Sequence, residues 1–220
     1  MGAGRDELVE ALLDRYGRTY ADEAGITLAD KPAALFQLLV LADLISARIS
    51  ADIAVSAARE LFKAGYTTAR AMREASWQDR VDALGRGHYK RYDERTSTML
   101  GQAAELLDER WGGDLRRLRD EANGEAAKIA ALLEEFPGIG PSGASIFLRE
   151  VQAAWPSVAP YADDRVGKGA RAVGLPADAG KLAALVTSNE EFARLCAALV
   201  RVTLSKDAAE EVKQAARAHG

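Results

Sequence analysis

The stretch Ile129-Ala-Ala-Leu-Leu-Glu-Glu-Phe-Pro-Gly-Ile-Gly-Pro-Ser-Gly-Ala-Ser-Ile-Phe-Leu-Arg149 predicts a helix, a sharp turn and a second helix. Gly138 and Gly140 permit a positive φ or a close approach by another backbone, and Pro141 suits the first position of the second helix. Ile139 is expected to fill the gap between the two helices. The free backbone N–H groups at the start of the second helix would then form a site suited to a phosphate, without any side-chain charge.

Proline placement leaves the region before this hairpin free to be helical, because Pro32 is followed by no proline until Pro137. Apolar residues recur there at helical spacing, and alternating β-branched strands are nearly absent. The fold class is therefore predicted to be all-α. The expected helices cover about 5–23, 33–48, 51–64, 68–75, 77–84, 90–110, 125–135, 189–204 and 206–218. A further helix, capped by Asp163 or Asp164, is expected to run to about Gly174.

Charge and cysteine content exclude several classes of function. The chain has 29 Lys and Arg against 33 Asp and Glu, so any surface for nucleic acid must be a local patch. A single cysteine, Cys196, and two histidines cannot supply a four-thiolate zinc or iron–sulfur site, and no cofactor is expected. No stretch approaches the roughly 18 uninterrupted apolar residues of a membrane span, so we expect a cytoplasmic protein without a membrane partner, nucleoid-associated if prokaryotic.

The hairpin resembles the helix-hairpin-helix motif of DNA repair proteins. The similarity continues downstream into Trp155-Pro-Ser-Val-Ala-Pro-Tyr-Ala-Asp-Asp-Arg-Val-Gly-Lys-Gly-Ala-Arg-Ala-Val-Gly-Leu175. Hairpin, proline-containing loop and aspartate together look like the HhH-GPD superfamily of DNA glycosylases, over roughly 32–176. The resemblance implies a two-lobed helical fold, with one lobe at 32–135 and the other made of 1–31 plus 136–220.

Two shorter segments extend the resemblance upstream. Ile45-Ser-Ala-Arg-Ile-Ser50 lies where endonuclease III-like members carry Leu-Ser-Ala-Gln, and Gly87-His88-Tyr89 lies where they carry Gly-Leu-Tyr or Gly-Phe-Tyr. In that family these loops push side chains into the duplex. By this resemblance Arg48 would fill the space left by an extruded nucleotide, and His88 would wedge into the opposite strand.

The resemblance also implies a catalytic aspartate at the start of the helix after the proline-containing loop. A carboxylate there can stabilise positive charge on the deoxyribose or orient an attacking water. Counting back from Gly174 in endonuclease III-like spacing selects Asp163, whereas the alkyladenine-glycosylase-like spacing to Lys168 selects Asp164. Bifunctional members carry a nucleophilic lysine where this chain has Ser142, which cannot form an imine, so the resemblance implies a monofunctional enzyme.

Further expectations concern the base pocket, a cation, the iron–sulfur loop and the DNA contacts; those for Tyr161, Arg165 and Lys168 come from their places beside Asp163 and Asp164. Tyr161 would line the base pocket. The backbone carbonyls of Glu134, Phe136 and Ile139 would hold a structural Na⁺ or K⁺, and the iron–sulfur loop of many members is missing. The candidate DNA-binding residues are Gly138, Ile139, Gly140, Ser142, Gly143, Arg48, His88, Arg165 and Lys168.

The function implied by the resemblance is base-excision repair: hydrolysis of the N-glycosidic bond of a damaged or mispaired base in double-stranded DNA, by a monomer. Two alternatives remain open. The fold could serve as a non-catalytic DNA-binding or damage-sensing module whose aspartates only cap a helix, or as a bifunctional glycosylase and lyase. The sequence does not identify the base.

Overall fold

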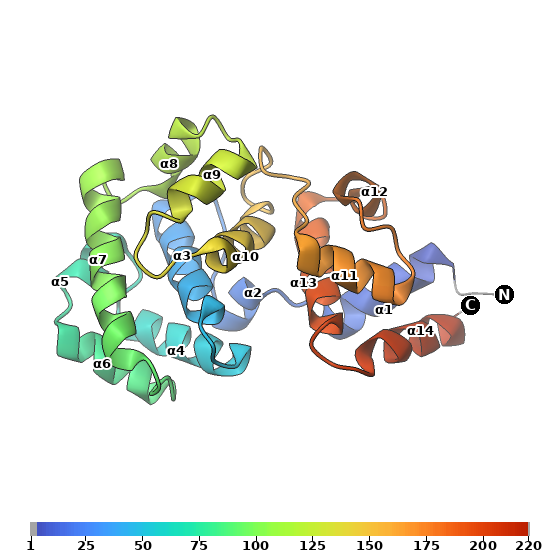
Figure 1. Ribbon diagram of the computed structural model, residues 1–220, viewed down its shortest axis with the longest axis horizontal. Coiled ribbons are helices and arrows are strands. Elements are labelled where there is room, and N and C mark those ends of the chain that lie inside the picture. Colours follow the sequence, from blue (N-terminus) through green and yellow to red (C-terminus); the bar gives the residue numbers. More distant parts are fainter. Residues whose placement is uncertain (1–3, 220) are drawn as a thin grey trace. The chain divides into compact units, whose positions relative to one another are not determined.

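A computed structural model describes residues 4–219. Within them the chain forms fourteen α-helices and no strand, so the prediction of an all-α fold is confirmed (Figure 1). None of the helices in this part of the chain is both long and apolar enough to cross a membrane.

The helices fall into two compact units, Tyr20–Val151 and Met1–Thr19 with Gln152–Gly220. The first unit contains α2 (Tyr20–Ala24), α3 (Pro32–Ser46), α4 (Ala51–Lys63), α5 (Ala69–Glu74), α6 (Trp77–Arg86), α7 (Asp93–Trp111), α8 (Leu115–Glu121), α9 (Ala126–Leu133) and α10 (Pro141–Val151). The second contains α1 (Arg5–Tyr16), α11 (Asp164–Val173), α12 (Ala179–Ala183), α13 (Asn189–Val202) and α14 (Ala208–His219).

The first unit is larger than the lobe expected at 32–135, because it also includes 20–31 and 136–151. Glu150, near the end of α10, gives the physical reason. Its buried carboxylate accepts hydrogen bonds from the backbone N–H groups of Tyr20 (3.1 Å) and Ala21 (2.9 Å) at the start of α2. α10 also packs along α3, so both α2 and the second hairpin helix belong with the helices that the sequence placed in the other lobe.

The expected single helix at 5–23 is two helices. Gly17 follows the last residue of α1, and its N–H donates to the carbonyl of Leu13 at 3.0 Å. Helix α2 then begins at Tyr20, whose backbone N–H donates to the carboxylate of Glu150. The short helices α8 and α12 were also not predicted, because segments of seven and five residues carry too few apolar positions to show a helical period.

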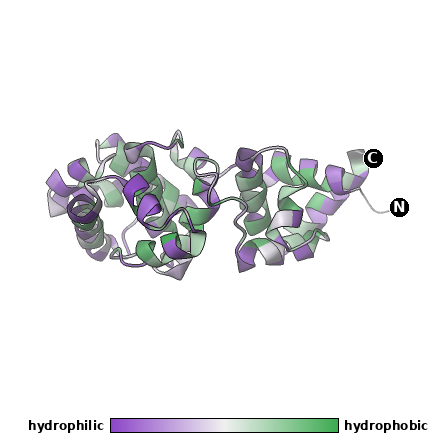
Figure 2. Ribbon diagram, turned by 90° about the horizontal axis from the view of Figure 1, so that it is seen from above, coloured by the Kyte–Doolittle hydropathy of each residue, from purple (hydrophilic) through white to green (hydrophobic). Residues whose placement is uncertain are grey.

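Helix α3 is the centre of the first unit. Its buried residues surround the helix rather than forming one stripe, and they include Leu35, Leu38 and Leu41, none with measurable exposure. A helix that is apolar on all sides is stable only when other helices cover it, and here α2, α4, α8 and α10 pack against it. Figure 2 shows the general pattern: hydrophobic residues lie mainly on the inner sides of the helices and hydrophilic residues on the outer sides.

The second unit has its own core between α1, α11, α13 and α14. Leu12, Val166, Leu199 and Val212 are fully buried in it. Helix α11 has a strongly one-sided pattern, with Val166, Ala170 and Val173 turned into this core. Its charged residues are thereby left on the opposite, exposed side.

Candidate functional site

The hairpin has the predicted form. Helix α9 ends at Leu133, and the N–H of Phe136 donates to the Leu133 carbonyl at 3.1 Å. Gly138 has a φ of +94°, a conformation that glycine adopts without steric cost. The N–H of Ile139 then donates to the Phe136 carbonyl at 3.0 Å, and α10 begins at Pro141.

Aromatic packing fixes the turn on the first unit. The ring of Phe136 stacks on that of Trp111 at the end of α7, with centroids 5.5 Å apart and planes at 20°. The indole N–H of Trp111 donates to Glu121 at 2.7 Å. Since Phe136 and Trp111 are both buried, the turn is held by core contacts as well as by its own backbone.

The candidate DNA-binding residues of the hairpin differ in exposure. Gly138 and Ser142 are exposed, Gly140 is half-buried, and Ile139 and Gly143 are buried. Ile139 packs against α10, because its side chain lies 3.3 Å from the position of a Cβ on Gly143, and it also adjoins Leu39 and Val40 of α3. Its side chain and Gly143 are therefore parts of the packing, and only their backbone groups remain as candidates for a phosphate contact.

The carbonyls expected to hold a cation lie in the same turn. Glu134 follows the last residue of α9, and the Phe136 carbonyl already accepts the hydrogen bond from Ile139. A carbonyl oxygen has two lone pairs, so Phe136 retains one for an ion. Neutral backbone oxygens are suitable ligands for a hard monovalent cation.

A cavity of about 410 Å³ lies beside the turn. It draws together three segments that the sequence singled out: the one containing Arg48, the one containing Tyr89, and the hairpin turn at Gly138. Its walls are Asp43, Ser46, Ala47, Arg48, Tyr89, Tyr92, Arg95, Thr96, Met99 and Gly138. All ten belong to the first unit, and the volume falls within the roughly 300–1,000 Å³ of small-molecule sites.

Arg48 and His88 occupy the connections that border this cavity. Arg48 is exposed directly after α3 and lines the cavity. His88 is exposed after α6 with a φ of +65°, and the next residue, Tyr89, is buried and lines the cavity. A positive φ is uncommon in residues other than glycine, and it marks His88 as a position held by its surroundings.

Asp43 is the residue that the sequence reasoning missed. It lies on α3 with 7% of its surface exposed, and its Oδ2 atom is buried without a hydrogen-bond partner. Burial raises the pKa of its carboxyl to about 7, and the nearby positive charge of Arg95 opposes the rise. A signal was available, because Asp43 is the one charged residue in the mostly apolar segment from Pro32 to Ser46.

The two candidate catalytic aspartates lie at the start of α11 in the second unit. Asp163 is the N-cap, and its Oδ1 accepts the backbone N–H of Val166 at 3.1 Å. Asp164 is the first helical residue and is exposed. The predicted capping role thus belongs to Asp163, and an N-cap position does not exclude further chemistry by the same carboxylate.

The loop before Asp163 is fixed by a side chain that the sequence reasoning also missed. The buried amide of Gln152 bonds both backbone groups of Tyr161: the Tyr161 N–H donates to Oε1 at 2.9 Å, and Nε2 donates to the Tyr161 carbonyl at 3.1 Å. The side chain of Tyr161 is half-buried. Gln152 therefore sets the backbone two residues before the candidate catalytic aspartate.

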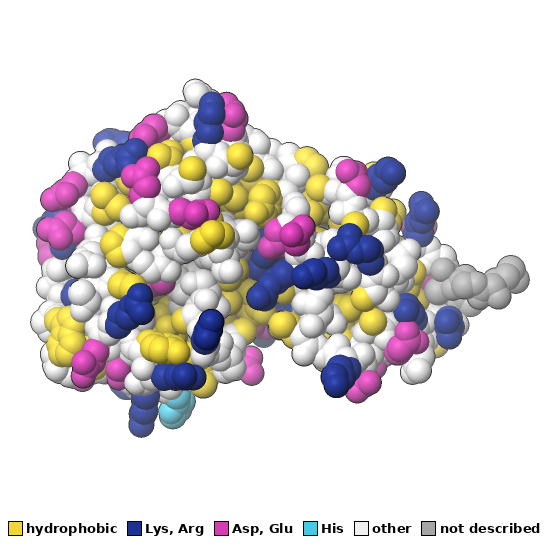
Figure 3. Space-filling model, viewed as in Figure 1, with side chains coloured by type: hydrophobic (Ala, Val, Ile, Leu, Met, Phe, Trp, Pro, Cys, Tyr) yellow, Lys and Arg dark blue, Asp and Glu magenta, His cyan; other side chains and the backbone are white. Residues whose placement is uncertain are grey.

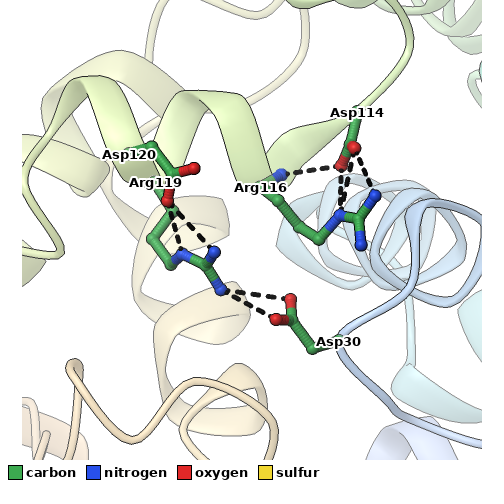
Figure 4. A network of polar contacts seen from close by, with 5 residues as sticks. All are labelled: Asp30, Asp114, Arg116, Arg119 and Asp120. Atoms are coloured by element: carbon green, nitrogen blue, oxygen red, sulfur yellow. Dashed lines mark hydrogen bonds and ion pairs between the residues drawn. The ribbon is translucent and has the colours of Figure 1, made fainter.

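Positive charge is distributed unevenly between α8 and α11. Arg116 and Arg119 on α8 are engaged by carboxylates: Arg116 bonds Asp114 (2.7 Å), and Arg119 bonds Asp30 (3.0 Å) and Asp120 (3.0 Å) (Figure 4). On α11, by contrast, Arg165 and Lys168 are exposed. Lys and Arg side chains gather over α11 on the face shown in Figure 3, which makes α11 the better candidate for a basic patch.

Solved structures that are similar to this chain include two endonuclease III complexes with DNA. One is an endonuclease III–DNA covalent intermediate in an estranged-adenine complex (TM-score 0.48), and the other is a non-covalent endonuclease III–DNA complex (TM-score 0.49). Each is 16% identical, covers 89% of this chain and is itself covered over 84% of its length. No family model matches the sequence, and no curated protein matches it significantly. The function is therefore argued from the residues of this chain.

Proposed function

We propose that this protein is a monofunctional DNA glycosylase of base-excision repair. It binds double-stranded DNA that contains a damaged or mispaired base and hydrolyses the N-glycosidic bond of that base. The observation that carries the proposal is the convergence of Arg48, Tyr89 and Gly138 on one cavity. These residues come from the three segments that resemble the glycosylases in the first unit, and they are separated by about forty to fifty residues along the chain.

The hairpin would supply the anchor on the DNA backbone. The first backbone N–H groups of a helix have no intrahelical acceptor and carry the positive end of the helix dipole, which favours a phosphate. Ser142 is exposed at this end of α10, and the α9–α10 turn is fixed by the stacked ring of Phe136. A cation on the carbonyls of Glu134, Phe136 and Ile139 would add positive charge next to the same phosphate.

Arg48 and His88 would act on the duplex itself. Extruding a base costs a few kcal/mol in lost stacking and pairing, and the cost is lower for a damaged or mismatched base. Side chains that occupy the vacated space offset part of that cost. Arg165 and Lys168 on α11 would contribute the local positive charge that an acidic chain needs for a polyanion.

Asp163 would carry the chemistry. Departure of a base leaves oxocarbenium-like charge at C1′ of the deoxyribose, which a carboxylate stabilises while a water attacks the same carbon. The base leaves with the bonding electron pair and gains a proton, and the sugar keeps a hydroxyl from water. Ser142 has no amine and cannot form the imine that strand cleavage requires.

The test is an excision assay on labelled duplexes that carry uracil, hypoxanthine, 3-methyladenine, 8-oxoguanine opposite adenine, thymine glycol or an abasic site. Strand breaks that appear only after alkali establish a monofunctional glycosylase and identify its base. Breaks without alkali would reveal lyase chemistry. Binding to abasic DNA with no product from any base would favour the non-catalytic damage-sensing module.

Variants at the aspartates separate catalysis from capping. Asparagine is as good an N-cap as aspartate, so Asp163→Asn keeps the start of α11 and removes the carboxylate. We expect excision to fall at least a hundredfold while DNA binding persists. Asp178→Asn, at the N-cap of α12, is the matched control and should excise normally. Loss of excision in Asp164→Asn, with normal Asp163→Asn, would transfer the role to Asp164.

A further inference from the structure

No hydrogen bond to Oδ2 within the described residues compensates for the burial of the Asp43 carboxyl. Its Oδ2 atom is inaccessible and has no hydrogen-bond partner, although a buried polar atom without a partner is costly. An apolar side chain at this position would complete the core, since Leu39, Val40, Leu100 and Ile139 adjoin the other side of Asp43. A buried carboxyl without a hydrogen-bond partner, in the wall of a cavity, indicates a group that forms its hydrogen bonds with a bound ligand.

The groups around the carboxyl determine which ligand suits it. Arg95, on α7, and Arg48, after α3, line the same cavity and present only hydrogen-bond donors. Tyr89 and Tyr92 are the other titratable residues of the wall, and the hairpin contributes Gly138, which has no side chain. The cavity therefore combines two guanidinium groups with one carboxyl whose pKa burial raises to about 7.

We propose that this cavity binds the extruded base, and that Asp43 selects an uncharged base with a carbonyl oxygen beside a ring N–H. Such bases arise by deamination or oxidation, as in uracil, hypoxanthine and oxidised pyrimidines. Oδ2 of Asp43 is inaccessible in this structure, so the side chain must rotate to bring both carboxyl oxygens to the cavity. The protonated carboxyl then donates to the carbonyl oxygen and accepts from the ring N–H. This inference rests on the proposed function and adds a substrate class to it.

The same chemistry disfavours two other classes of base. A cationic N-alkylated purine would meet the positive charges of Arg48 and Arg95, against which Asp43 supplies only one negative charge even when it ionises. Adenine can pair its 6-amino group and a ring nitrogen with the protonated carboxyl, but a ring nitrogen has one lone pair and cannot accept from both Asp43 and Arg95, as a carbonyl oxygen can. Discrimination comes from the polar groups that a wrong base would leave unpaired.

The experiment measures binding of the full chain to duplexes that cannot be hydrolysed. The probes contain 2′-fluoroarabino analogues of deoxyuridine, deoxyinosine, deoxyadenosine or 7-methyldeoxyguanosine, and a tetrahydrofuran abasic site serves as the reference without a base. For each protein the readout is the ratio of the tetrahydrofuran Kd to the base-containing Kd. This ratio isolates the base pocket from the phosphate contacts of the hairpin.

We expect the wild type to bind the deoxyuridine or deoxyinosine duplex about tenfold more tightly than the tetrahydrofuran duplex at pH 6. The preference should decline as the pH rises through about 7 and Asp43 loses its proton. Asp43→Asn keeps a donor and an acceptor but does not titrate, so it should retain a preference that no longer depends on pH. Asp43→Leu should reduce the ratio to about one.

Three results would overturn the inference: an unchanged preference in Asp43→Leu, an unchanged pH dependence in Asp43→Asn, or tighter binding of the 7-methyldeoxyguanosine or deoxyadenosine duplex than of either keto base. These results differ from a failure of the proposed function itself. If the wild type binds neither the tetrahydrofuran duplex nor any other probe and excises no base, the glycosylase assignment fails and the substrate class fails with it.

Discussion

The turn glycine of the hairpin lies against the buried carboxylate of α3: a Cβ placed on Gly138 would be 2.5 Å from Oδ1 of Asp43. Contacts that short do not occur between real side chains, so position 138 must remain without a Cβ while Asp43 keeps its place. The φ of +94° at Gly138 is an independent reason why this position favours glycine. The hairpin turn and the wall of the cavity are therefore one packed unit, and a change in either should affect the other.

Alanine at the two turn glycines should have different effects. Gly138→Ala combines a left-handed backbone with the contact to Asp43, and should lower the free energy of unfolding by roughly 2–4 kcal/mol. A Cβ on Gly140 would meet nothing within 4 Å, and the φ of Gly140 is not positive. Gly140→Ala should therefore leave stability within about 0.5 kcal/mol of wild type but weaken binding to a tetrahydrofuran duplex, where a methyl group would face the DNA backbone.

Urea unfolding and fluorescence anisotropy measure these two quantities. Equal destabilisation by both substitutions would contradict the geometry of the turn. Unaltered DNA binding in Gly140→Ala would place the phosphate contact elsewhere.

Asp43 should make stability depend on pH. Because burial raises its pKa from 3.8 to about 7, the folded chain binds a proton more tightly than the unfolded chain. The free energy of unfolding should fall as the pH rises from about 4 to 7, and stay low above that. Asp43→Asn should remove this slope and stabilise the protein at pH 8 by up to about 4 kcal/mol.

Urea unfolding midpoints measured between pH 5 and pH 8 test whether the free energy of unfolding falls as the pH rises. Glu150, whose pKa is also raised by burial, contributes a slope in the same direction and should supply what remains in Asp43→Asn. The carboxyls with lowered pKa, such as Asp114 and Glu121, lose their protons below this window. A midpoint that rises with pH in the wild type would show that Asp43 is not buried as a free carboxyl.

Local chemistry explains which features the sequence could predict. The hairpin turn depends on Gly138 and Pro141, which act within a few residues, and both the turn and the start of α10 were predicted at their observed positions. The cap at Asp163 follows from the same short-range rules. The break between α1 and α2 was missed, because it depends on a carboxylate from Glu150, 130 positions away from Tyr20.

The cavity was harder to predict for the same reason. Arg48 and Tyr89 belong to segments that resemble known loops, but Arg95 and Thr96 join them only because α7 packs beside the end of α3. The charge pattern of α7 gives no sign of this, since its other charged residues are ordinary surface groups. Asp43 was recognisable in principle, as a lone charge in an apolar helix.

His88 allows backbone strain to be separated from function. Glycine accepts a φ of +65° freely, so His88→Gly should change stability by at most about 1 kcal/mol, in the stabilising direction. Binding to a duplex with a tetrahydrofuran site should weaken several-fold if the imidazole wedges into the DNA. His88→Asn is the matched control for the backbone, since asparagine also tolerates this region but is shorter. Full DNA affinity in both variants would assign His88 to an exposed loop without a DNA contact.

Ser142 provides a gain-of-function test of where the hairpin meets the DNA. The residue is exposed in the first turn of α10, so Ser142→Lys should fold normally, with only a few tenths of a kcal/mol lost to the helix dipole. If the turn lies next to the deoxyribose, the new amine can attack C1′, displace the base and form an imine, which borohydride reduces to a stable amine. We expect a covalent protein–DNA adduct with Ser142→Lys and none with Ser142→Arg, which carries the same charge but no nucleophilic amine. An adduct absent from both variants, in a protein that still excises its base, would mean that α10 begins too far from the reacting carbon for a side chain at position 142 to reach it.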